Sequence, residues 1–98
     1  MLEHYDRQGN PIDPQRWLEL RAQRDYVRIA EASIGKWWVS TVWFGMNMAF
    51  TPHQRPLIFE TLVFDINTNQ ATDYMQRYST EVSALAGHDQ AEAWARDN

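Results

Sequence analysis

The chain has 98 residues, of which 44% are hydrophobic and 22% are charged, and its formal net charge is −4 at pH 7. This length predicts a single domain spanning residues 1–98, and the acidic balance argues against binding of long nucleic acid. The chain contains no cysteine and no apolar run long enough for a secretory signal or a membrane span, so we expect a cytoplasmic protein without disulfides, thiolate metal sites or membrane contacts.

The N-terminal segment predicts a hook followed by a short helix. Residues 9–11 (Gly-Asn-Pro) mark a tight turn, so we expect a small hairpin or hook over residues 5–13. Asp13 precedes Pro14, and an N-cap aspartate followed by proline is typical of a helix start. Residues 14–23 are therefore predicted to form a short helix.

Residues 24–34 fit two patterns. They either continue the preceding helix or alternate as a strand, with Val27 and Ile29 among its apolar positions. The β-branched and aromatic residues of this region favour the strand, and Gly35 with Lys36 would make a tight turn into the next one. We prefer a hairpin here, although the sequence leaves the helical alternative open.

The clearest strand spans residues 37–45 and contains three tryptophans. Its alternation predicts two faces, one with Trp38, Ser40, Val42 and Phe44, and the other with Trp37, Val39, Thr41 and Trp43. A loop follows over residues 46–55, and its methionines suit an adaptable contact surface. Residues 56–65 form the second strong strand, with Glu60 as the one carboxylate inside an apolar run.

The C-terminal part predicts a short last strand and a helix. Residues 74–79 alternate as the strand, and Ser79 or Thr80 is expected to cap the helix that follows. We assign its core-facing stripe to Val82, Leu85, Ala86 and Ala93. The opposite face carries small residues that would permit close approach of another backbone or of another subunit, namely Ala84, His88, Ala91 and Ala95.

These elements predict an α+β fold, an antiparallel meander of about four strands with a short N-terminal helix and a C-terminal helix packed on one face. An antiparallel sheet can leave its second face in water if that face is polar, yet both faces here carry aromatic side chains. We therefore expect a second subunit or a ligand to cover the second face. Alternation alone does not tell which face is the core.

The sequence shows little catalytic chemistry. The three histidines, His4, His53 and His88, lie far apart and lack metal-ligand spacing, so we predict no metal site and no cofactor. A hydrolase built from Ser40, a histidine and Glu60 ranks last, because Ser40 lies inside a strand rather than on the sharp turn that exposes a nucleophile. We predict that the chain is not an enzyme.

Three motifs punctuate the chain: W-V-S-T-V-W-x-G at residues 38–45, P-L-I-F-E-T-x-V-F at 56–64 and R-Y-x-T-E-x-x-A-x-x-G-H at 77–88. Together they resemble a family of short, uncharacterised proteins encoded by bacteriophages and bacteria. The resemblance implies an accessory role in a phage setting, and it assigns no activity and no catalytic residue.

We predict a small non-enzymatic binding protein that contacts a host or viral protein, or a second copy of itself in a homodimer, through an aromatic sheet face. The alternative is a binder of a small nucleotide-type ligand, with aromatic rings stacked on the base and arginine on the phosphate. Glu60 must be paired, with Arg77 or Arg28, or must anchor that ligand. The predicted binding residues are Trp37, Trp43, Met46, Asn47, Phe50, Glu60, Arg77 and Tyr78.

Overall fold

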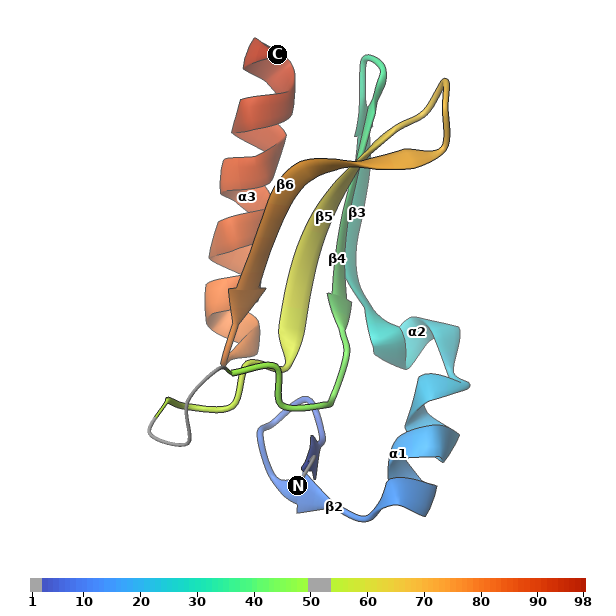
Figure 1. The fold of residues 1–98 in the computed structure, drawn as a ribbon, viewed down its shortest axis with the longest axis vertical. Coiled ribbons are helices and arrows are strands. Elements are labelled where there is room, and N and C mark those ends of the chain that lie inside the picture. The colour runs from blue at the N-terminus through green and yellow to red at the C-terminus, as the bar shows by residue number, and fades with distance from the viewer. Residues whose placement is uncertain (1–2, 50–53) are drawn as a thin grey trace.

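The computed structural model describes residues 3–49 and 54–98 and has an α+β architecture, as predicted. Four consecutive strands form an antiparallel sheet in the order β3-β4-β5-β6. Helix α3 packs on one face of this sheet, and a two-stranded sheet lies with two short helices at one end (Figure 1). The elements are β1 (His4–Tyr5), β2 (Pro11–Ile12), α1 (Pro14–Arg21), α2 (Arg24–Val27), β3 (Arg28–Ile34), β4 (Trp37–Trp43), β5 (Phe59–Asp65), β6 (Gln70–Tyr78) and α3 (Glu81–Asp97).

The N-terminal hook and helix form where the sequence predicts them. The Asp6 carboxylate accepts hydrogen bonds from the backbone N–H groups of Gln8 and Asn10, at 3.0 and 2.9 Å, and these bonds close the turn between β1 and β2. The Asp13 carboxylate caps α1 by accepting from the Arg16 N–H at 2.7 Å.

The segment of residues 24–34 contains both of the conformations that its sequence fits. Its first four residues make the single helical turn α2, and the rest form β3, which pairs with β4. Gly35 has φ of +57° in the connecting turn, a conformation that glycine adopts without steric cost. The predicted hairpin is therefore confirmed, and it begins at Arg28.

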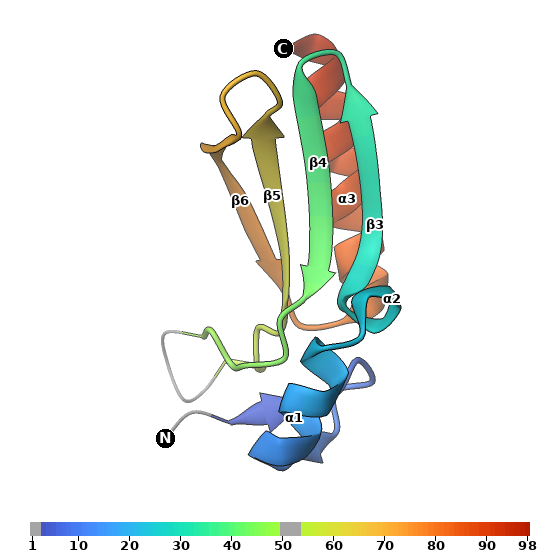
Figure 2. The same ribbon diagram turned by 90° about the vertical axis from the view of Figure 1, so that its right-hand side faces the viewer.

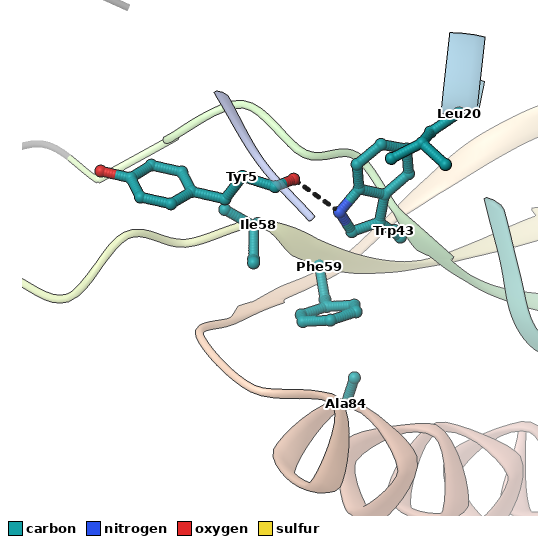
Figure 3. Close-up of a cluster of buried hydrophobic side chains, with 6 residues drawn as sticks. All are labelled: Tyr5, Leu20, Trp43, Ile58, Phe59 and Ala84. Atoms are coloured by element: carbon teal, nitrogen blue, oxygen red, sulfur yellow. Dashed lines mark hydrogen bonds between the residues drawn. The ribbon is translucent and has the colours of Figure 1, made fainter. Parts of the chain in front are cut away.

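The core lies between α3 and the face of the sheet that carries Trp43. Six residues along β4 and β5 have no exposed surface on this face: Val39, Thr41, Trp43, Phe59, Thr61 and Val63. Figure 3 shows Trp43 in the cluster at the end of the sheet next to the N-terminal hook, where its indole N–H donates to the Tyr5 carbonyl at 3.0 Å. Complete burial of a large apolar side chain contributes about 1.5–3 kcal/mol, so Trp43 is a principal anchor of the fold.

The predicted core stripe of α3 is wrong. Val82 is 79% exposed and Leu85 is 44% exposed, and both point away from the sheet. The residues that α3 buries are Ala84, Gly87, His88, Ala91 and Ala95. The sheet supplies bulky tryptophan, phenylalanine and tyrosine side chains, so the helix packs closely only where its own side chains are mostly small. The small-residue face therefore meets the sheet of the same chain.

Candidate binding surface

Most of the face of the sheet opposite α3 is not covered by any helix or strand of the described residues, and only one end of it meets α1 and α2 (Figure 2). We call it the open face. Because paired residues on neighbouring antiparallel strands point to the same side, the register identifies its members. They are Arg28, Glu31, Ser33, Trp38, Ser40, Val42, Glu60, Leu62, Phe64, Met75 and Arg77.

The centre of the open face is apolar and partly aromatic. Trp38 on β4 pairs with Phe64 on β5, and their rings lie 5.1 Å apart between centroids. Leu62 is the next open-face residue of β5, and it lies opposite Met75, which is 46% exposed. Large apolar side chains that meet on an uncovered surface typically mark a contact site.

Ion pairs flank this apolar centre. Arg77 Nε donates to Glu60 Oε2 at 3.0 Å between β6 and β5, so Arg77 is the partner among the two that the sequence left open for Glu60. The Glu60 side chain is only 13% exposed, so the pair satisfies a carboxylate that apolar neighbours would otherwise leave poorly solvated. At the edge of the sheet, Arg28 lies 3.5 Å from Glu31 on the same strand.

A hollow of about 370 Å³ lies where α1 and α2 meet the open face, and we call it the arginine hollow. Three arginines line it, from the end of α1, the start of α2 and the start of β3. Its floor comes from β4. The lining residues that matter below are Arg21, Arg24, Arg28, Glu31, Trp38 and Ser40.

Among the three arginines, Arg21 is the one that contacts both a backbone carbonyl and an aromatic ring. Its Nη1 donates to the Trp43 carbonyl at 2.9 Å, and its guanidinium carbon lies 5.3 Å from the centre of the Phe44 ring. Burial lowers the pKa of Arg21, because the neighbouring side chains remove water from the charged group. The side chain is therefore fixed in place with its charge incompletely solvated.

A second hollow of about 370 Å³ lies at the opposite end of the open face, beside the turn between β5 and β6. Trp38 and Phe64 form its apolar part, and Ser33, Asp65, Ile66 and Asn69 complete the lining. Trp38 lines both hollows, so its indole stands at the centre of the uncovered surface.

The structure divides the predicted binding residues between the two faces. Glu60 and Arg77 lie together on the open face. Trp43 lies in the core with no exposed surface, and Trp37 packs on the α3 side, 5.3 Å from the Trp94 ring. The two tryptophans therefore do not share a surface with Glu60.

The predicted binding residues of the 46–55 loop make contacts that hold this loop to neighbouring segments. Met46 forms an isolated bridge with His4, and the Asn47 side-chain oxygen accepts from the Leu57 N–H at 3.3 Å. Phe50 lies outside the described residues.

Tyr78 belongs to a buried chain of hydrogen bonds between the sheet and α3. Its hydroxyl donates to Thr61 at 3.1 Å, Thr61 meets Thr41 at 2.6 Å, and Thr41 meets His88 Nδ1 at 2.7 Å. His88 Nε2 lies 3.0 Å from Glu92 Oε2. Because Tyr78 donates at one end and the Glu92 carboxylate accepts at the other, every bond is satisfied when His88 is neutral with its proton on Nε2.

The linked side chains of Thr41, His88 and Glu92 have the composition of a hydroxyl–histidine–carboxylate catalytic set, but their position excludes that role. Thr41 is 0% exposed and His88 is 3% exposed, so no substrate reaches the hydroxyl. The set considered from the sequence is not assembled either, because Ser40 and Glu60 lie on the open face, whereas His88 belongs to α3 and points into the core on the other side of the sheet. His53 lies outside the described residues.

Within residues 3–49 and 54–98, no cluster of His, Asp and Glu side chains could hold a metal ion. No helix in that part of the chain is long and apolar enough to cross a membrane. Comparisons with protein-family models, with curated proteins and with solved structures give no match for this chain.

The sequence did not single out six of the candidate residues: Arg21, Arg24, Trp38, Leu62, Phe64 and Met75. The sequence held a signal for Leu62 and Phe64, because strand alternation puts them on the same face as Glu60, and the register of the structure adds Trp38 as the partner of Phe64. A carboxylate inside an apolar strand marks the face in contact with water. No comparable signal existed for the arginines, because only the turn at α2 brings them around one hollow.

Proposed function

We propose that this protein is a non-enzymatic binding protein that contacts another protein through its open face. The observation that carries the proposal is the uncovered apolar centre formed by Trp38, Leu62, Phe64 and Met75. Aromatic and methionine side chains are enriched at protein interfaces, and a polar rim typically surrounds them. The Glu60–Arg77 and Arg28–Glu31 pairs supply such a rim.

Charge complementarity favours an acidic partner over a second copy of this chain. The open face and the arginine hollow together carry four arginines and two glutamates, while the whole chain has a net charge of −4. In a two-fold dimer this positive surface would meet itself, whereas an acidic partner would be steered toward it. The motif resemblance supports a phage-encoded accessory factor that acts in the host cytoplasm.

Substitution of Met75 by lysine tests this proposal. Met75 is 46% exposed, so Met75→Lys adds a charge to the centre of the open face without disturbing the core. Val82→Lys is the matched control, because Val82 is 79% exposed and lies on the outward side of α3. A partner captured from host extract is identified, purified and mixed with each variant, and the complexes are measured by light scattering and titration calorimetry.

We expect the purified partner to be acidic, to form a defined complex with the wild-type chain, and to lose affinity at least about tenfold with Met75→Lys but not with Val82→Lys, because the desolvation of a lysine inside the apolar contact costs more than its attraction to the partner returns. Equal loss in both variants, or in neither, would contradict the proposal. A mass of twice 11.6 kDa for the chain alone that Met75→Lys returns to 11.6 kDa would assign the open face to a homodimer instead.

A second candidate function, binding of a small nucleotide-type ligand, is favoured by the arginine hollow. Three arginines beside a half-buried indole provide the two parts of such a site, cations for phosphate and a ring for the base. The volume of about 370 Å³ lies at the lower end of the range found for small-molecule sites.

A further inference from the structure

The arginine hollow concentrates positive charge on an acidic chain. Three of the eight arginines in the sequence line it, with Glu31 as the carboxylate among its lining residues. The lining therefore carries a net charge of +2, from three arginines and one glutamate. A concave site of one sign attracts ligands of the opposite sign, so the hollow selects for anions.

Several hydrogen-bond donors in this hollow are unused. Within residues 3–49 and 54–98, Arg24 makes no ion pair or side-chain hydrogen bond, and the same holds for the Ser40 hydroxyl and the Trp38 indole N–H. These groups come from α2 and β4 and line one cavity. An oxyanion binds where positive charge and hydrogen-bond donors without protein partners surround it, and this hollow provides both.

The other two arginines differ in how readily they can bind a ligand. Arg28 pairs with Glu31 at 3.5 Å, and both side chains are about 40% exposed (41% and 40%). An exposed pair of this kind is weak, so a phosphate can displace Glu31 without much loss. Arg21 is already bonded to the Trp43 carbonyl, and it therefore acts as a fixed charge behind the site.

Trp38 gives the hollow a flat apolar wall. One side of its indole is near Phe64, at 5.1 Å between centroids, and the residue also lines the arginine hollow. An indole next to arginines suits a ligand with a planar ring and an anionic group, because base stacking and charge-assisted hydrogen bonds then act together.

We propose that the arginine hollow binds a mononucleotide, with its phosphate on Arg24 and Arg28 and its base against Trp38. The proposal rests on the second candidate function above and names its ligand class and contacts. The Ser40 hydroxyl lies at the floor between the two parts and donates to the ligand. Arg21 strengthens phosphate binding through its charge.

Titration calorimetry on the full chain at low salt tests the proposal. The probes are the four ribonucleoside monophosphates, adenosine and inorganic phosphate. We expect at least one monophosphate to bind at least about tenfold more tightly than adenosine and than inorganic phosphate, because the phosphate and the base each contribute. Absence of monophosphate binding would overturn the proposal, and binding equal to that of adenosine or of inorganic phosphate would overturn the corresponding half of it.

Three variants locate the site. Arg24→Gln and Arg28→Gln should each weaken monophosphate binding about tenfold, and Arg16→Gln is the control because Arg16 is an exposed arginine on α1 outside the hollow. An equal effect of Arg16→Gln would show general charge attraction and would contradict the site. Met75→Lys should leave monophosphate binding unchanged, so failure of the protein-contact proposal and failure of this one give different results.

Discussion

Tyr78 on β6 lies directly against Gly87 on α3, and a methyl group at Gly87 would overlap the phenol ring. The glycine lets the ring pass close to the helix, so that its hydroxyl reaches Thr61 at 3.1 Å. Gly87 therefore sets how closely α3 approaches the sheet.

Gly87→Ala is expected to destabilise the protein. Alanine favours the helical state by about 1 kcal/mol over glycine, but overpacking against a rigid ring costs about 1–3 kcal/mol. Urea unfolding should show a net loss in the free energy of unfolding. In a Tyr78→Ala background the overlap disappears, and the same substitution should then stabilise the protein. A gain in the wild-type background would contradict the packing seen here.

Thr41→Val should be costly although the side chains are nearly equal in size. Valine cannot donate to His88 Nδ1 or accept from Thr61, so two buried groups lose a partner. Such unsatisfied groups cost about 1–3 kcal/mol each, and unfolding experiments should detect the loss. Ser40→Ala is the control, because the Ser40 hydroxyl has no hydrogen bond among the described residues and lies on the open face. It should change stability by less than about 0.5 kcal/mol.

The series of hydrogen bonds from Tyr78 to Glu92 predicts the tautomer of His88. Nitrogen NMR of the imidazole should show the Nε2 tautomer, with its proton directed at Glu92. A proton on Nδ1 would mean that Thr41 does not donate to His88, and the order of hydrogen bonds from Tyr78 to Glu92 would then be incorrect.

The features that the sequence predicted are local ones. Alternation within a strand depends only on backbone geometry, so the two faces of β4 and the tight turn at Gly35 were predictable. Asp13 and Thr80 cap their helices through one side-chain hydrogen bond, which is also a local interaction. One prediction reached beyond local geometry: a carboxylate in an apolar strand needs a partner, and Arg77 or Arg28 was expected to supply it for Glu60.

The features that it did not predict depend on shape and on distant segments. Hydrophobicity favoured Val82 and Leu85 as the buried side of α3, but the bulky sheet leaves room mainly for small side chains there. Trp43 and Glu60 could not be assigned to different surfaces until the register between β4 and β5 was known.

Glu81 makes stability depend on pH. The Arg7 Nε and Nη2 groups donate to its two carboxylate oxygens at 2.8 and 2.6 Å, and these hydrogen bonds lower the pKa of Glu81 below its usual value of 4.5. Because the folded pKa is the lower one, the carboxylate stabilises the fold above its unfolded pKa. That contribution decreases as the pH falls and is lost below the folded pKa.

Glu81→Gln should therefore lower the free energy of unfolding by about 1 kcal/mol at pH 7, and the difference from wild type should shrink as the pH falls below about 4.5. Thermal unfolding at a series of pH values measures it. Glu19→Gln is the control, because Glu19 is 55% exposed and lies 3.8 Å from Arg16. A difference for Glu81→Gln that stays constant down to pH 2 would show that the charge of Glu81 is not what stabilises the fold.

The orientation of α3 can be tested with two alanines that are two residues apart. Ala91 has no exposed surface and packs in the cluster with Val39 and Val63, whereas Ala93 is exposed. Ala91→Leu should force the helix from the sheet and destabilise the protein by about 1–3 kcal/mol, because a well-packed core does not accommodate three added carbons. Ala93→Leu should change stability by less than about 0.5 kcal/mol, since the helical propensities of the two residues are similar. The reverse result would place Val82 and Leu85 in the core and expose His88, and the hydrogen bond from Thr41 to His88 could not then exist.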